Sequence, residues 1–206
     1  MGDIVTQPRP RGRPRSFEPK AALDAAMRVF WAEGYDGASV DQLCRAMNMP
    51  RSSLYQQFSD KEALFLAAIA HYGETRIATV TEALGPRGRL DEDLQAFFEA
   101  VADLATSEPD APGCLVSCVL ADAAGANPTF RAELERRFAA LEARIAARLD
   151  AGHSELDCGA DTPTLALLLA AIARGLMLRA RAGADRQRLA DTGTAAVALV
   201  CRDRRG

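Results

Sequence analysis

The sequence has few aromatic residues, two histidines and no paired-cysteine framework, and each shortage excludes a class of protein. Aromatic residues make up 6% of the 206 residues. Ala and Leu are abundant, so helix is favoured over sheet and we expect an all-α fold. The five cysteines are an odd number without a C-x-x-C pair or an export signal. This favours a reduced, cytoplasmic compartment over a disulfide scaffold.

Long apolar runs and catalytic machinery are also missing. The longest apolar run, residues 165–173, ends at Arg174 and is too short to span a bilayer, so we expect no membrane anchor. His71 and His153 have no metal-ligand spacing, and no glycine-rich phosphate loop is present. We therefore expect neither an enzyme nor a protein that needs a cofactor or metal.

Positive charge is concentrated near the start of the chain. The net charge is −3, but residues 1–58 hold eight Lys or Arg against six Asp or Glu, and the remainder holds seventeen against twenty-two. Residues 1–16 are rich in Pro and Arg and have no periodicity, so we expect a disordered basic arm. Its sequence around Gly12 resembles an AT-hook, which places Arg side chains in the minor groove of A·T-rich DNA. Its candidate DNA contacts are Arg11, Arg13 and Arg15; a solubilising tail is the alternative.

Residues 39–65 carry the most specific signals. Ser39 can cap a short helix with apolar residues at helical spacing, namely Val40, Leu43, Cys44 and Met47. Asn48 tolerates the left-handed conformation of a sharp turn, and Pro50 suits the first turn of a new helix. Two helices should therefore meet at a tight turn.

The second of these helices, about residues 50–58, has an outer face made of hydrogen-bonding groups. Leu54 and Phe58 are four residues apart and can face inward. The residues left outside are Arg51, Ser52, Ser53, Gln56 and Gln57. Arg and Gln can make paired hydrogen bonds to guanine and adenine, so this face suits a major groove. We interpret the pair as a helix-turn-helix; a helical hairpin with a solvated polar face is the alternative.

These residues resemble the DNA-binding domain of the TetR family of transcriptional regulators. The matching motifs are Gly34-Tyr35, Ser39-Val40-Asp41, Leu54-Tyr55, Phe58 and Asp60-Lys61-Glu62-Ala63-Leu64-Phe65. The sequence departs from the family at Met47-Asn48-Met49, where Ala-Gly-Val is usual, and at Ser52, where Gly is common. Ser52 leaves the operator sequence open.

Three further residues join the candidate DNA contacts: Ser39, Tyr55 and Lys61. The family tyrosine that matches Tyr55 commonly binds a phosphate, although a surface tyrosine closing the small core is the alternative. Lys61 begins a helix, where free N–H groups and its own charge can hold a phosphate. A solvated lysine is the alternative there.

The rest of the chain is predicted to be helical as well. We expect helices over residues 18–33, 60–84, 90–106, 113–124, 127–149, 163–182 and 185–201, and a loop over residues 152–161. Residues 1–16 are assigned to the arm, 17–62 to the helix-turn-helix domain, and 63–206 to a ligand-binding and dimerisation domain. The resemblance implies a homodimer whose last two helices pair with those of a second copy, although these helices could instead close the core of a monomer.

The resemblance also implies a cavity for an unknown small-molecule effector. Its candidate lining residues are Phe97, Phe98, Val101, Leu115, Cys118, Phe138, Arg174 and Met177. Arg174 lies in an apolar helix and needs a partner, either Asp122, Asp103 or an acidic effector.

Cys114 and Cys118 form a candidate thiol sensor. They are four residues apart, and Cys114 begins a predicted helix, which favours thiolate. Some members of the family with a comparable Gly-Cys-Leu segment respond to electrophiles. Buried, inert cysteines are the alternative.

The leading hypothesis is a dimeric TetR-like repressor that leaves a near-palindromic double-stranded DNA operator when an effector binds. The long helix over residues 60–84 would couple the effector site to the recognition helices. A redox- or electrophile-responsive regulator and an effector-independent architectural DNA-binding protein are the alternatives.

Overall fold

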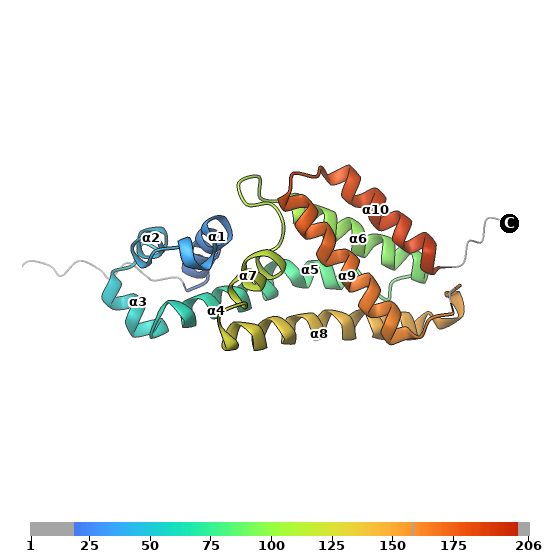
Figure 1. Cartoon of the computed structure of the whole chain (residues 1–206), viewed down its shortest axis with the longest axis horizontal. Coiled ribbons are helices and arrows are strands. Elements are labelled where there is room, and N and C mark those ends of the chain that lie inside the picture. Colours follow the sequence, from blue (N-terminus) through green and yellow to red (C-terminus); the bar gives the residue numbers. More distant parts are fainter. Residues whose placement is uncertain (1–18, 158, 202–206) are drawn as a thin grey trace, which may run out of the picture.

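The computed structural model describes residues 19–157 and 159–201, and this part of the chain is helical. Its one β-type pairing is an isolated antiparallel bridge between Leu156 and Cys201. The predicted all-α fold is confirmed. The first three helices lie at one end of the molecule, and a helical bundle forms the other end (Figure 1). The predicted arm, with Arg11, Arg13 and Arg15, lies outside the described residues.

The first three helices form the small unit at one end: α1 (Pro19–Gly37), α2 (Val40–Ala46) and α3 (Arg51–Phe58). Gly34, with φ of 76°, breaks the helical conformation of α1 at the residue where the sequence predicts its end. The Ser39 hydroxyl accepts from the Gln42 N–H at 3.2 Å, and the Gln42 side chain accepts from the Ser39 N–H at 2.9 Å. This capping box starts α2. Asn48 has φ of 50°, so the predicted left-handed turn is confirmed.

A helical link leads away from this unit. It comprises α4 (Lys61–Tyr72), the π-helical turn η1 (Gly73–Ile77) and α5 (Ala78–Glu82). The prediction of one regular helix over residues 60–84 is therefore wrong in one respect, because a π turn interrupts it. The Arg137 guanidinium lies where a side chain at position 73 would stand, so the wide turn and the glycine together make room for it.

The bundle contains α6 (Leu90–Thr106), η2 (Leu115–Leu120, π-helical), α7 (Ala121–Ala123), α8 (Pro128–Ala151), η3 (His153–Glu155, 3₁₀), α9 (Thr162–Arg181) and α10 (Arg186–Val200). Side chains of Asn127, Asp161 and Asp185 accept from backbone N–H groups and so cap α8, α9 and α10. The stretch predicted as a loop, residues 152–161, contains the short η3 turn.

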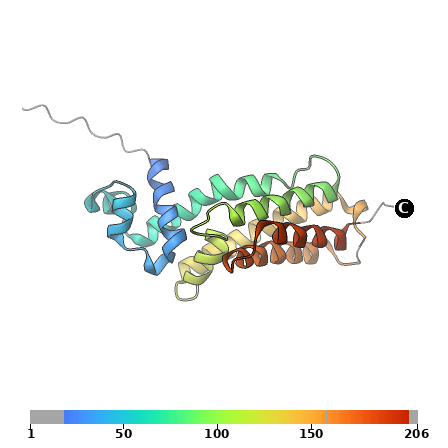
Figure 2. The same ribbon diagram turned by 90° about the horizontal axis from the view of Figure 1, so that it is seen from above.

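The long helix α8 runs beside the link and touches both ends of the molecule (Figures 1 and 2). At its start, the Phe130 ring lies 4.8 Å from the Tyr35 ring and 5.1 Å from the Phe65 ring, centroid to centroid. The Asn127 amide donates to the Glu62 carboxylate at 2.8 Å. The small N-terminal unit is therefore attached to the bundle through α8 as well as through the link.

Helix α9 is long and apolar enough to cross a bilayer by length and composition, and it alone passes that test among the described helices. Its most apolar window is 44% buried. The buried side packs against α6, α8 and α10, as the core helix of a bundle does. The exposed side carries Leu167, Leu168 and Leu178.

Candidate DNA-binding surface and ligand cavity

Helix α3 presents a polar face to solvent. Leu54 is fully buried in the small core and Phe58 is half-buried, so the helix is anchored along one side. The opposite side exposes Arg51, Ser52, Tyr55, Gln56 and Gln57, with Ser53 half-buried. The structure therefore brings the candidate base-contacting residues of the recognition helix together on one free surface.

Arg51 is held by weak, exposed contacts. Its guanidinium lies 3.4 Å from the Asp41 carboxylate and 5.9 Å from the centroid of the Tyr55 ring. Hydrogen bonding to Tyr55 raises the pKa of Arg51 further above its usual value, so the group stays charged. Exposed contacts of this kind contribute little to stability, so they hold the Arg51 side chain only weakly.

Lys61 and Ser39 already have intramolecular partners. The Lys61 ammonium lies 4.5 Å from the centroid of the Tyr35 ring and donates to the Asp36 carbonyl at 3.5 Å. Partial burial lowers the pKa of Lys61. The Ser39 hydroxyl serves as a helix cap, although its own hydrogen remains available to a phosphate. Both residues begin helices beside α3, where N–H groups point outward.

A cavity of about 400 Å³ lies between the link and the bundle. The link contributes Gly73, Ile77 and Thr81, among others, and α6, α8 and α9 contribute the opposite walls. Five of the predicted lining residues are there: Phe97, Val101, Phe138, Arg174 and Met177. Three lining residues that were not predicted from the sequence are Arg137, Leu141 and Arg144, whose spacing on α8 places them on one face. On an amphipathic helix that spacing alone does not separate a cavity wall from ordinary core.

The other predicted lining residues do not reach the cavity. Phe98 follows Phe97 on α6 and so points to another side, where it packs against Gly193 of α10. Leu115 is fully buried in the core. Cys118 packs toward Gly113 instead. These three assignments were wrong because neighbouring residues on a helix face different directions.

Arg174 pairs with Glu142, a partner that was not predicted from the sequence. Both of its terminal nitrogens lie 3.0 Å from one Glu142 oxygen, and its guanidinium lies 4.3 Å from the centroid of the Phe138 ring. The predicted alternatives, Asp122 and Asp103, were wrong. Asp103 binds Arg186 at 2.6 Å, and Asp122 is exposed. The pairing joins α8 to α9 over 32 residues of sequence, which no local pattern could reveal.

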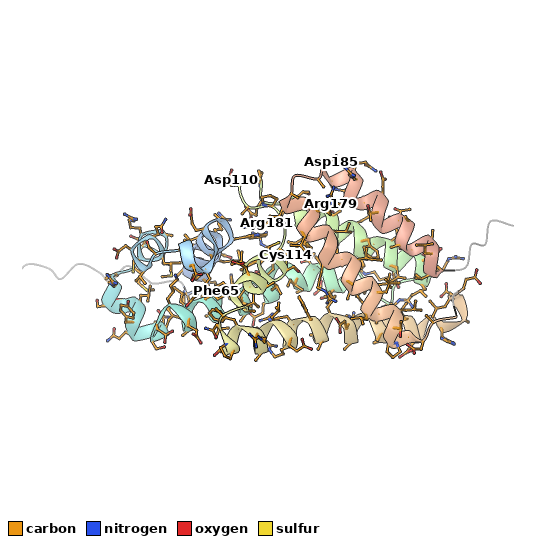
Figure 3. The ribbon with its side chains drawn as sticks, in the orientation of Figure 1. Phe65, Asp110, Cys114, Arg179, Arg181 and Asp185 are labelled. Atoms are coloured by element: carbon orange, nitrogen blue, oxygen red, sulfur yellow. The ribbon has the colours of Figure 1, made fainter. Side chains whose placement is uncertain are left out.

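The two candidate sensor thiols occupy different environments (Figure 3 labels Cys114). Cys114 is buried and lines the cavity, whereas Cys118 does not. Burial raises the pKa of the Cys118 thiol, the opposite of what a reactive thiolate needs. Beside Cys114 is Tyr72, whose pKa is raised well above its usual value, chiefly by burial and then by that thiol. Cys114 is therefore the better placed of the two to meet a molecule in the cavity.

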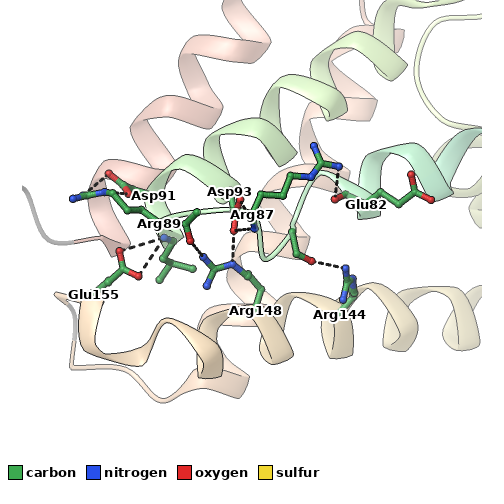
Figure 4. A network of polar contacts seen from close by, with 11 residues as sticks. Glu82, Arg87, Arg89, Asp91, Asp93, Arg144, Arg148 and Glu155 are labelled. Carbon is green, nitrogen blue, oxygen red and sulfur yellow. Dashed lines mark hydrogen bonds and ion pairs between the residues drawn. The ribbon is translucent and has the colours of Figure 1, made fainter.

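A polar network fastens the far end of the link to α8 (Figure 4). The Arg148 Nε donates to Asp93 Oδ2 at 2.8 Å, and both side chains are 4% exposed. Asp93 also accepts from the Arg87 N–H at 3.1 Å, and Arg148 donates to the Gly88 carbonyl at 3.1 Å. We name this set, Arg87, Gly88, Asp93 and Arg148, the turn clasp.

Arg144 adds a contact next to the turn clasp. Its Nη2 donates to the Gly85 carbonyl at 2.7 Å (Figure 4), and the same side chain lines the cavity. Gly85 stands at the turn that follows α5, with φ of 68°. One arginine therefore touches both the cavity and the end of the link.

The described residues hold no group of three or more His, Cys, Asp or Glu that could bind a metal. His71, one of the two histidines, has a structural contact: its Nε2 lies 2.8 Å from Asp24 Oδ1 and so joins α4 to α1.

Comparison with known proteins yields matches along most of the chain. Residues 22–68 match the family model described as "Bacterial regulatory proteins, tetR family". Residues 91–196 match the one described as "Tetracyclin repressor-like, C-terminal domain". The chain is 30% identical over 185 residues to the HTH-type transcriptional repressor ComR of Escherichia coli (strain K12), a match that covers 87% of each chain.

Two further relatives cover similar lengths. The HTH-type transcriptional repressor Rv1474c of Mycobacterium tuberculosis is 32% identical over 171 residues, which is 82% of this chain and 84% of that one. Among solved structures, a cysteine mutant of the TetR family transcriptional regulator CifR, complexed with 26-base-pair operator DNA, superposes with a TM-score of 0.82. That pair is 29% identical, over 92% of this chain and 100% of the other.

Proposed function

The chain belongs to the tetR family of DNA-binding transcriptional regulators, and we propose that it is a homodimeric repressor that a small-molecule effector releases from a near-palindromic operator. Members of this family regulate transcription and are not enzymes. We further propose the domain roles predicted from the sequence: residues 17–62 bind DNA, and residues 63–206 bind the effector and a second copy of the chain. The protein is proposed to act in the cytoplasm.

The exposed face of α3 supports base recognition. Gln56, Gln57 and Arg51 are exposed on a helix whose opposite side is anchored by the buried Leu54. Amide and guanidinium groups in this arrangement can make paired hydrogen bonds in a major groove. Tyr55 on α3, and Ser39 and Lys61 on either side of this helix in the sequence, could make the phosphate contacts that set its register.

The exposed apolar side of α9 and α10 is the observation that carries the proposal. Leu167, Leu168 and Leu178 of α9 are about half exposed, and Leu199 of α10 is 78% exposed. Alanines and small residues separate them, so a second copy could approach closely. A two-fold pair would cover this surface and give the two α3 helices a fixed separation.

The position of the cavity supports release by an effector. Its walls include Gly73, Ile77 and Thr81 from the link and Phe97, Phe138 and Met177 from the bundle. A molecule between them favours one packing of the link over another, and so one separation of the recognition helices. The π turn lies in this wall, and such turns are frequent at functional sites.

The dimer is tested with Leu199→Glu and the pair Leu168→Glu/Leu199→Glu, each measured by sedimentation velocity and by binding to operator selected from random duplexes. The matched control is Ala139→Glu, which adds the same charge to an exposed position of α8. We expect the leucine variants to dissociate and to lose operator affinity, while the control stays dimeric. A wild-type chain that remains monomeric at operator-binding concentrations would contradict the proposal, as would leucine variants that associate normally.

A second candidate is release by an electrophile that reacts with Cys114. The supporting observation is that Cys114 lines the cavity. Treatment with N-ethylmaleimide should then reduce operator affinity in the wild type and spare Cys114→Ser. Unchanged affinity after Cys114 has been labelled, verified by mass spectrometry, would remove this candidate.

A further inference from the structure

The lining of the cavity has an imbalance of charge. Arg137, Arg144 and Arg174 are part of it, whereas no Asp or Glu is among the described lining residues. We propose that the effector is an amphipathic anion, with an apolar body in the cavity and a carboxylate-like head bound by Arg137 and Arg144. The inference rests on the proposed function, because it specifies the effector of the same cavity.

Only part of this positive charge is balanced by the protein. Arg174 is neutralised by Glu142. Arg137 donates from Nε to Glu133 at 2.7 Å, but the same carboxylate is bound by Arg136 at 2.6 Å, so one negative charge faces two positive ones. Burial alone would raise the pKa of Glu133, but its hydrogen bonds from Arg136 and Arg137 outweigh this and lower it. The Glu133 carboxylate is therefore shared between two guanidinium groups and cannot balance the full charge of Arg137.

Arg144 has no carboxylate partner among the described residues. Its hydrogen bond goes to the neutral Gly85 carbonyl and its side chain is exposed, so its charge is available to an anion from solution. Arg137 and Arg144 are seven residues apart on α8, so both point to the same side of the helix. A guanidinium offers five N–H donors in a planar fork that fits a carboxylate. In this structure the two guanidinium groups lie apart, one at Gly73 and the other at the Gly85 carbonyl. Their Cα atoms are about 10 Å apart along the helix, a distance that two arginine side chains can close around one anionic head.

The remaining wall is apolar. It is lined by the side chains of Ile77, Phe97, Val101, Leu104 and Met177. A small inorganic anion would leave this surface in contact with water, and a neutral apolar molecule would make no use of Arg144, which has no carboxylate partner among the described residues. At about 400 Å³ the cavity is in the lower part of the range of small-molecule sites, roughly 300–1,000 Å³. A carboxylate with a medium-length alkyl or an aromatic body can bind the arginines through its head and cover the apolar wall with its body.

The same two arginines touch both ends of one segment of the link. Arg137 packs over Gly73, where η1 begins, and Arg144 holds the Gly85 carbonyl, just after α5. An anionic head that draws these guanidinium groups toward the cavity would change the contacts at both ends of residues 73–85. The group that recognises the charge can thereby transmit the signal.

The test compares decanoate with decanamide, which have the same alkyl body but differ in charge. Isothermal titration and thermal shift are measured on the full-length dimer, and release of selected operator is measured in parallel. The variants are Arg137→Gln and Arg144→Gln. The matched control is Arg131→Gln, since Arg131 lies on the same helix and also donates to a backbone carbonyl, that of Gly125, but is not part of the cavity.

We expect decanoate to bind about tenfold or more tightly than decanamide, because a hydrogen bond to a charged group contributes more than a neutral one. Each cavity variant should lose most of this preference while still binding decanamide, which also shows that its cavity is folded. Arg131→Gln should behave as the wild type.

Three results would overturn the inference: equal affinity for both probes, a preference that survives in both cavity variants, or no binding of either probe to the folded dimer. Failure of the proposed function is measured separately, without any probe. If selection from random duplexes yields no operator that the dimer binds, the proposed repressor is contradicted. If decanoate and decanamide release the operator equally, only the proposal of an anionic effector is contradicted.

Discussion

The turn clasp should contribute strongly to stability, and Asp93→Asn tests this. The Asp93 and Arg148 side chains are both 4% exposed, so removing the carboxylate charge strands a buried guanidinium. Breaking a buried pair on one side costs about 3–5 kcal/mol. Asn keeps an oxygen that can accept from the Arg87 N–H, so we take the lower end, about 3 kcal/mol. For a chain of this length, 1 kcal/mol corresponds to roughly 2–4 °C, which gives a fall in melting temperature of about 6–12 °C.

The assay is thermal unfolding followed by circular dichroism at one fixed protein concentration, because the stability of a dimer depends on concentration. The matched control is Asp91→Asn, two residues earlier on α6, where the carboxylate pairs with Arg89 in contact with solvent. We expect no measurable change for the control, since exposed pairs contribute little.

A double variant separates the stranded charge from the lost hydrogen bonds. Asp93→Asn/Arg148→Gln removes both charges, so it should be more stable than Asp93→Asn alone. If the double variant were less stable than the single one, the reasoning from a stranded charge would be refuted. The same holds if Asp93→Asn melted at the temperature of Asp91→Asn.

Three further predictions concern DNA and thiols. Gln56→Ala should weaken binding to selected operator by about 1–3 kcal/mol per recognition helix and leave the affinity for random DNA unchanged. Fluorescence anisotropy on both duplexes measures this, and equal losses of affinity would exclude base recognition by Gln56. Lys61→Ala should weaken all sequences alike and reduce the salt slope by about one per protomer, so a sequence-selective loss would count against a phosphate contact. Because burial raises its pKa, Cys118 holds less thiolate than an exposed thiol at pH 8. Iodoacetamide should therefore label it slowly, at a rate that rises with pH, and rapid labelling at pH 7 would contradict this.

Several elements were predictable because their causes lie within a few residues of sequence. Ser39 and Gln42 are three residues apart and cap α2 together. Asn48 takes the left-handed turn, and Asn127 caps α8 just before Pro128. The positive φ of 55° at Ser59, before α4, was not predicted, because no glycine or asparagine marks that position.

The helices, their caps and the polar face of α3 therefore follow from local sequence, since short-range spacing sets which side chains share a helix face. The packing of the whole fold sets which of these faces meet. It paired Arg174 with Glu142, turned Phe98 away from the cavity, and placed Arg137 over Gly73. These contacts join residues 32 or more positions apart, and they depend on how whole helices pack rather than on any local preference.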